Sequence, residues 1–277
     1  MANVLQKTAE EYKPRGRLDP AAFREHITLA TYAPPEDLAA YVEHFWMVSW
    51  NDLEGVYHSE DVMHRPYVDI FISREQIGVQ GTFRNKRTYK AEGNGKIVGI
   101  RFLPGAFYAV WGGDMARLQN EMLDLNDVFP GRGTQLPESM LEESDEAIVS
   151  RLATFVRECR PRPNTNIQLI NDIIRMIETD DITTVGDIAK TVHKSERWLQ
   201  QLFQEYIGVG LKWLLQRRRL LDAAEVIRGS AAMPNWAAIA YDLGYSSQQH
   251  FNSDFKKVME KTPLQYYRQT NRSAHAE

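Results

Sequence analysis

The sequence predicts an α+β protein whose N-terminal half is rich in strands and whose C-terminal half is all helical. Short strand-like stretches interrupted by glycines occupy the first half, and a helix–turn–helix pattern occurs twice in the second. A proline-rich stretch at 160–164 separates the halves. We therefore expect a polar N-terminal segment (1–25), a first domain (26–160), a linker (161–166) and a second domain (167–277).

Composition restricts the class of protein. The chain has 277 residues, of which 43% are hydrophobic and 25% charged, as in ordinary soluble proteins. No apolar run approaches the length of a membrane span, and the first residues lack the apolar core of a signal peptide. The single cysteine, Cys159, allows neither an intrachain disulfide nor a cysteine zinc cluster. We expect a cytoplasmic protein that contacts no membrane and uses no cofactor.

The first domain contains four short strand-like stretches, at 44–50, 67–73, 76–80 and 96–103. The first stretch alternates, which places one set of side chains on one face (His44, Trp46, Val48 and Trp50) and Phe45 and Met47 on the other. Helical patterns follow around 107–111, 117–123 and 138–157. Short strands with glycine turns, followed by helices, predict a small barrel or bent sheet.

Each copy of the repeated pattern has the parts of a helix–turn–helix. Ser195 and Ser247 are candidate N-cap residues, and apolar residues follow each at helical spacing. The pattern predicts recognition helices at about 195–206 and 247–258. Their polar faces offer the donors and acceptors that base edges require. These faces carry Arg197, Gln200 and Gln201 in the first copy, and Gln248, Gln249, His250, Asn252 and Ser253 in the second.

Charge predicts a local contact surface for DNA. The net charge is −4, but residues 167–277 hold 14 Lys and Arg against 13 Asp and Glu. A nearly neutral domain must gather its cations into a patch to bind phosphate. The candidate members are Arg197, Arg217, Arg218, Arg219, Lys256, Lys257 and Lys261.

An ordered set of residues extends this pattern beyond the two helices. The set comprises Asp187-Ile188-Ala189, Ser195, Leu199, Phe203, Gly208, Arg219-Leu220, Ala223, Ile239-Ala240, Leu243-Gly244-Tyr245, Phe251, Phe255-Lys256-Lys257, Thr262-Pro263 and Tyr267-Arg268. It resembles the DNA-binding domain of the AraC/XylS family of bacterial transcription regulators. The resemblance implies seven helices, with a long one at about 211–228 joining two helix–turn–helix units.

The same resemblance assigns base contacts to the residues that match the family's reading positions. These residues are Arg197, Gln200, Gln201, Gln248, Gln249, Asn252 and Ser253. The chain departs from the family pattern at four places, one of which is Leu214, where tyrosine is frequent. His193 and Glu260 stand where glycine is frequent, and Ser253 stands where arginine is frequent.

The stretch Val98-Gly99-Ile100-Arg101-Phe102-Leu103-Pro104-Gly105 is similar to one in AraC-like regulators that have a cupin-like N-terminal domain. The resemblance implies a small cupin-like β-barrel with helices. Trp46, Trp50, Tyr67 and Arg101 are then candidate ligand contacts. Arg101 could hold a ligand carboxylate or pair with an acidic residue such as Asp69, and we favour the structural pair because a buried guanidinium needs a partner.

Two further groupings have alternative interpretations. The acidic and histidine residues of the first domain lack the His-x-His that metal-binding cupins use, so no metal site is expected at His44, His58, Glu60, His64 or Asp69.

The 138–157 helix has one apolar stripe, which could pair with its copy in a homodimer or pack on its own barrel. The family resemblance favours the homodimer.

The sequence thus predicts a transcription regulator that reads double-stranded promoter or operator DNA. Its first domain would sense a small-molecule effector or set the oligomeric state, and an activator would also meet RNA polymerase. The alternative is a DNA-binding regulator whose first domain binds a protein partner and no ligand. An enzyme is not expected, because the chain has no phosphate-binding glycine loop, no nucleophile elbow and no cluster of reactive cysteines.

Overall fold

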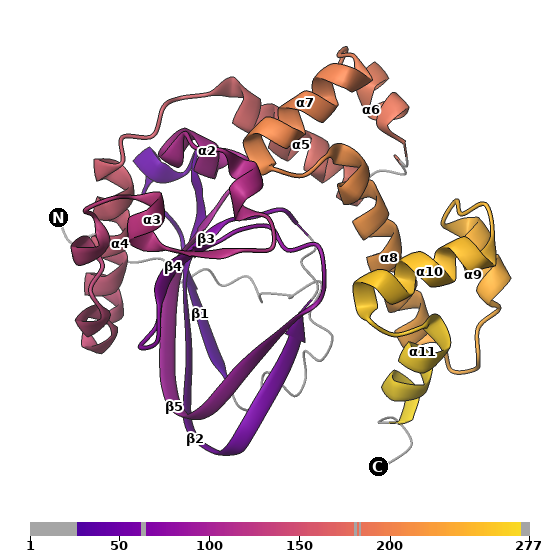
Figure 1. Cartoon of the computed structure of the whole chain (residues 1–277), viewed down its shortest axis with the longest axis horizontal. Helices are drawn as coiled ribbons and strands as arrows, with labels where there is room; N and C mark the ends of the chain where they lie inside the picture. The colour runs from indigo at the N-terminus through magenta and orange to yellow at the C-terminus, as the bar shows by residue number, and fades with distance from the viewer. Residues whose placement is uncertain (1–26, 62–64, 180–181, 183, 273–277) are drawn as a thin grey trace.

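The computed structural model describes residues 27–61, 65–179, 182 and 184–272. The polar segment predicted at 1–25 lies outside these residues. Figure 1 shows a bent sheet flanked by short helices, followed by a chain of helices that ends in the second helix–turn–helix unit. The two helix–turn–helix units lie at opposite ends of one long helix, α8.

The first part of the chain forms one antiparallel sheet with the order β1-β2-β5-β3-β4-β6. Its strands are β1 (Thr28–Tyr32), β2 (Val42–Asp61), β3 (Asp69–Ile72), β4 (Ile77–Gln80), β5 (Arg87–Phe102) and β6 (Met122–Asp124). Among the described residues β1 and β6 each pair with one strand only, so the sheet is open. The small cupin-like β-barrel that the resemblance implied is therefore not closed, because these two edges do not meet; the other expectation, a bent sheet, agrees with the structure.

The long β2–β5 hairpin bends sharply in its middle. Its pairing register shifts between Trp50 and Val56, and Asp52, Gly55 and Gly93 adopt positive φ there. We call residues 44–50 with 95–101 the proximal arm, and residues 56–61 with 87–92 the distal arm. In Figure 1 the bend lies at the bottom of the view, and the two arms diverge upward from it as a V. The sequence predicted only the proximal arm.

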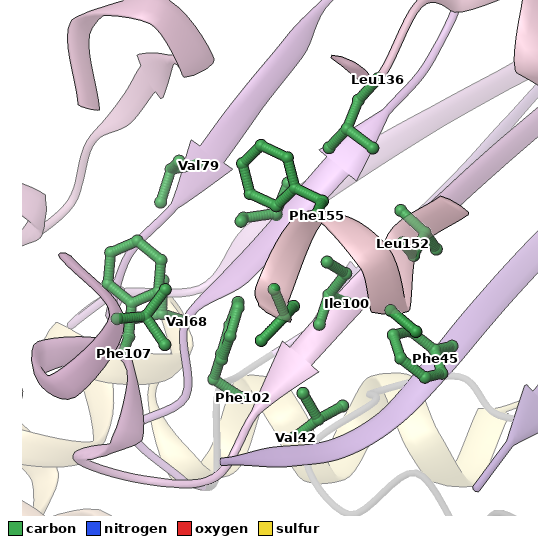
Figure 2. Close-up of a cluster of buried hydrophobic side chains, with 14 of the residues drawn as sticks. Val42, Phe45, Val68, Val79, Ile100, Phe102, Phe107, Leu136, Leu152 and Phe155 are labelled. Atoms are coloured by element: carbon green, nitrogen blue, oxygen red, sulfur yellow. The ribbon is translucent and has the colours of Figure 1, made fainter. Parts of the chain in front are cut away.

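The outer face of the sheet carries the core of the first domain. Phe45, Ile100 and Phe102 are fully buried against α4 (Asp145–Glu158), which contributes Leu152 and Phe155 (Figure 2). Smaller elements complete this layer: α2 (Ala106–Trp111), α3 (Leu125–Val128) and single 3-10 turns at Glu36–Leu38, Met115–Leu118, Gly133–Gln135 and Glu138–Glu142. As the alternation predicts, Phe45 and Met47 face this core.

Two predicted helices differ in the structure. The predicted 138–157 helix is a 3-10 turn followed by α4. The backbone is extended at Glu143 and Ser144 between them, and the Ser144 hydroxyl caps the start of α4. The apolar stripe of α4 packs on its own sheet, so it leaves no such stripe for a homodimer partner. The predicted 117–123 helix is wrong, since the chain there forms the 3-10 turn Met115–Leu118 and then β6 (Met122–Asp124), which pairs with β4.

The second part of the described chain contains seven helices, the number that the resemblance implies. They are α5 (Thr165–Thr179), α6 (Val185–Thr191), α7 (Glu196–Ile207), α8 (Leu211–Gly229), α9 (Trp236–Asp242), α10 (Gln248–Met259) and α11 (Pro263–Arg272). Two separate apolar cores form around them. Leu211 and Leu214 at the start of α8 belong to the first core, and Ala223 and Ile227 near its end belong to the second.

Candidate nucleic-acid interface and effector cavity

The two recognition helices, α7 and α10, begin as predicted. The Ser195 hydroxyl accepts a hydrogen bond from the Trp198 amide at 3.2 Å, and the Ser247 hydroxyl accepts one from the His250 amide at 3.2 Å. Each bond satisfies an amide that the first helical turn leaves free. Both N-caps are therefore confirmed, and each helix buries its apolar stripe in its own core.

The turns that precede the recognition helices have matching geometry. His193 in the first turn has φ 53°, and Gly244 in the second has φ 74°. In each unit, an amide after the turn donates to an alanine carbonyl of the preceding helix, from Lys194 to Ala189 and from Tyr245 to Ala240. His193 thus adopts the left-handed conformation that a glycine takes in the family pattern, at a cost of about 1 kcal/mol.

Most of the predicted DNA-contacting side chains are exposed. The exposed set is Arg197, Gln201, Gln248, Gln249, His250, Ser253 and Lys257. Gln200 and Asn252 are half-buried, and each has one buried polar atom without a hydrogen-bond partner, Nε2 of Gln200 and Oδ1 of Asn252. These two side chains are turned partly toward the protein and would have to rotate to contact a base.

The helix α8 sets the separation of the two units. A helix of 19 residues is about 28 Å long. Successive major-groove segments on one face of a duplex lie about 34 Å apart. Each end of α8 is packed into a different core, so the helix holds the two units apart.

The first domain packs against the C-terminal end of α7. Gln119 donates to the Gly208 carbonyl, and the Tyr108 hydroxyl donates to Glu205 at 3.0 Å. The rings of Tyr108 and Tyr206 lie 4.6 Å apart. These contacts leave the start of α7, including Arg197, exposed.

The predicted cationic patch loses one member. Arg217 is 1% exposed, with its guanidinium 4.8 Å from the Trp213 ring centroid and donating to the Arg84 carbonyl of the first domain. It is therefore a domain-contact residue in this structure, and the expectation that it belongs to the DNA-facing patch is wrong. Arg218 is also engaged, since it donates to Asp222 and to the Glu178 carbonyl.

The salt dependence of DNA binding should distinguish a cation buried in a domain contact from a cation exposed for phosphate contact. We expect Arg217→Met to leave the slope of log K against log salt unchanged, because no phosphate contact is lost. Lys257→Ala should reduce the slope by about 1, because one counterion fewer is released. Fluorescence anisotropy titrations over a salt series measure both. A reduced slope for Arg217→Met would show that Arg217 leaves its buried position on DNA.

A cavity of about 230 Å³ lies on the inner face of the bent sheet, with lining residues from both arms. The four predicted ligand residues, Trp46, Trp50, Tyr67 and Arg101, all line it. The distal arm adds Tyr57, Arg87 and Tyr89, which the sequence did not identify. The four alternating residues from His44 to Trp50 share this face, as predicted.

Arg101 forms the buried ion pair that the sequence favoured. Its Nε and Nη2 donate to the two carboxylate oxygens of Asp69 at 2.9 and 2.8 Å, and the two side chains are 12% and 5% exposed. The guanidinium also lies 3.6 Å from the Tyr67 ring centroid. Nearby His44 is neutral at physiological pH, because burial, and then the Arg101 charge, lower its pKa to about 3.

One short segment joins the cavity to the DNA-binding helices. Residues 81–86, the domain-contact loop, connect Gln80 with Arg87, and both of these flanking residues line the cavity. The loop contributes the Arg84 carbonyl to Arg217, and the Lys86 ammonium lies 3.1 Å from the Glu260 carboxylate. Glu260 directly follows α10 and has φ 59°, so it adopts the left-handed conformation where the family pattern has glycine.

No group of three or more potential metal ligands occurs among the described residues. Within the same part of the chain, no helix combines the length and apolarity that crossing a membrane requires.

Two family models match the chain in separate regions. A model described as "Helix-turn-helix domain" matches residues 188–269, and one described as "Domain of unknown function (DUF6597)" matches residues 30–124. The regulatory protein SoxS of Escherichia coli strain K12 is 34% identical over 101 residues, which are 36% of this chain and 92% of SoxS. The chain belongs to the AraC/XylS family of transcription regulators. This is a family of DNA-binding regulators and not of enzymes.

Other relatives match smaller or larger parts of the chain. The regulatory protein PocR of Salmonella typhimurium is 31% identical over 99 residues, which are 35% of this chain. The chain spans about a third of the length of PocR (31%) and of the E. coli regulator YkgA (34%). Among solved structures, an AraC-type regulator from Chromobacterium violaceum gives a TM-score of 0.35 at 24% identity, covering 41% of this chain and 100% of that one. ToxT of Vibrio cholerae gives 0.33 at 15% identity, covering 88% and 97%.

Proposed function

We propose that this regulator reads two successive major-groove segments on one face of a duplex, one with α7 and the other with α10. The observation that carries the proposal is the pair of exposed polar helix faces, each on its own apolar core and joined by α8. Exposed Gln201, Gln248 and Gln249 offer the paired donor and acceptor that match an adenine edge. Lys257, at the end of α10, offers a phosphate contact.

Arg197 is the side chain best suited to fix one base. It is exposed near the start of α7, the end of a recognition helix that usually enters the groove. A guanidinium forms two parallel hydrogen bonds with the O6 and N7 of guanine. In this proposal Arg197 specifies a guanine in the first half-site.

Arg197→Ala should therefore cost roughly 1–3 kcal/mol of binding at one base position. Binding to operator variants substituted one base pair at a time measures this, with Lys257→Ala as the matched control that weakens binding to all sequences. Equal losses on specific and random DNA for Arg197→Ala would assign Arg197 to phosphate instead.

We further propose that the cavity of the first domain binds a small effector and that its occupancy changes DNA affinity. The bent sheet would act as a cupin-like cradle, although its edges do not close. The support is a cavity lined mostly by aromatic and aliphatic side chains, with the domain-contact loop joined to two of its lining residues, Gln80 and Arg87. An effector that moves Gln80 or Arg87 would move the loop that holds Arg217 and Glu260.

Linkage gives the test of this second part. Small molecules released from the purified full chain would be identified by mass spectrometry, and DNA affinity would be measured with and without them. A true effector changes DNA affinity, and DNA changes effector affinity by the same factor. If nothing is released and DNA affinity responds to no small molecule, the first domain serves a protein partner, which is the alternative function.

A further inference from the structure

Among the described residues, Arg87 is a cavity-lining cation with no acidic side chain at salt-bridge distance. Its guanidinium lies 3.9 Å from the Phe83 ring centroid and 5.4 Å from that of Tyr89, and its Nη2 is 3.1 Å from the Met122 sulfur. No carboxylate of the described residues lies within salt-bridge distance of it. Its Nη1 is buried and has no hydrogen-bond partner. A buried guanidinium nitrogen without an acceptor is uncommon, because its desolvation is uncompensated.

The other charges that line the cavity are already balanced. Arg101 and Asp69 neutralise each other through two hydrogen bonds. The Lys90 ammonium lies 2.9 Å from the Glu92 carboxylate. Among the described residues, the charge on the cavity wall that has no opposite partner is therefore the positive charge of Arg87. This positive charge disfavours a cationic ligand, which the aromatic walls alone would attract.

A second unsatisfied donor lines the same cavity. The Trp46 indole nitrogen is buried and has no hydrogen-bond partner, whereas the Trp50 indole donates to the Glu92 carbonyl at 3.1 Å. The remaining walls are largely apolar or aromatic, with Val48, Phe71 and Ile97 among them. The complementary ligand has an apolar body, one negative charge and acceptor oxygens.

We propose that the cavity binds a small apolar monocarboxylate whose carboxylate is held by Arg87, and not by Arg101. This inference rests on the proposed effector function and names the chemical class of the effector. The planar guanidinium of Arg87 matches the two oxygens of a carboxylate. A dianionic phosphate would need more than one unpaired cation, or backbone amides in addition. The described residues of the cavity wall supply one unpaired cation, Arg87.

The test compares carboxylates with their neutral counterparts on the full chain. The probes are phenylacetate, indole-3-acetate and octanoate, each paired with its primary amide. Calorimetry reports binding, and so does the intrinsic fluorescence of the chain, to which Trp46 and Trp50 of the cavity contribute. We expect the best carboxylate to bind roughly 10- to 100-fold more tightly than its amide, as for hydrogen bonds to a charged partner. Equal binding of acid and amide would overturn the proposal.

Three variants assign the preference to a side chain. Arg87→Gln should bring the acid-to-amide ratio close to one while amide affinity is kept, which also shows that the cavity still forms. Arg87→Lys should restore part of the preference. Lys90→Gln removes a second cavity-lining cation from the same strand and should leave the ratio unchanged. A ratio that survives Arg87→Gln would contradict the assignment.

The same titrations separate this proposal from the broader one. Equal binding of acids and amides would support the proposal that the cavity binds a small molecule and reject the proposal that this molecule is a carboxylate. Binding of neither, together with no small molecule released from the purified chain, rejects the effector function and the carboxylate proposal together.

Discussion

Asp69→Ala is expected to destabilise the first domain by about 3–5 kcal/mol, the usual cost of removing one partner from a buried ion pair. The substitution leaves the Arg101 guanidinium, 12% exposed, without its two carboxylate acceptors on the inner face of the sheet. The pair also fixes register, because Asp69 on β3 and Arg101 on β5 are direct cross-strand partners. Urea unfolding of the full chain, followed by the fluorescence of the cavity tryptophans, measures the loss.

The matched control removes both charges at once. Asp69→Leu combined with Arg101→Met should restore most of the stability, because an apolar pair of similar size leaves no buried charge without a partner. Arg101→Gln alone should destabilise the domain, because Asp69 then keeps its charge without the guanidinium. A small effect of Asp69→Ala, below about 1 kcal/mol, would show that water or another group replaces the carboxylate.

Phe255→Ala should loosen the second helix–turn–helix unit and spare the first. Phe255 is fully buried, with the rings of Phe251 and Tyr266 each 5.6 Å away. Removing such a ring typically costs about 3–5 kcal/mol, because a cavity replaces it. The loss should be confined to the core that contains Phe255, since α8 separates the two cores. Hydrogen exchange should rise in α9–α11 and stay unchanged in α5–α7.

The corresponding change in the first unit provides the control. Phe203 is fully buried in the first core and occupies the position in α7 that Phe255 occupies in α10. Phe203→Ala should raise exchange in α5–α7 and, because α7 also carries the contacts with the first domain, weaken domain packing. Equal loosening of both units by either substitution would mean that the two cores unfold as one.

Local patterns predicted the parts of the fold that depend on local physics. The alternation from His44 to Trp50 placed Phe45 and Met47 in the core and the other residues on the cavity face. The serine caps of α7 and α10 were predictable because a hydroxyl satisfies the amides of its own helix. The Arg101–Asp69 pair followed from the cost of burying a lone guanidinium.

The parts that depend on distant contacts were not predictable from local pattern. The β5 part of the distal arm alternates between inward and exposed residues, but most residues of the arm are polar or charged, so hydrophobicity in the sequence did not mark it as a strand. Arg217 resembled a surface cation in the sequence, and only the docking of the Arg84 carbonyl buries it. Arg87 was also missed, because it reaches the cavity wall only through the bend of the hairpin, which the sequence did not predict.

Hydroxyl-radical footprinting of the full chain on an operator selected from random DNA tests the central claim most directly. If α7 and α10 read successive major-groove segments, two protected stretches should appear on one face of the duplex, about 10 base pairs apart centre to centre. Inserting five base pairs between them should abolish one stretch, because the second segment rotates to the opposite face. A single protected stretch, or uniform protection that salt removes, would contradict the account.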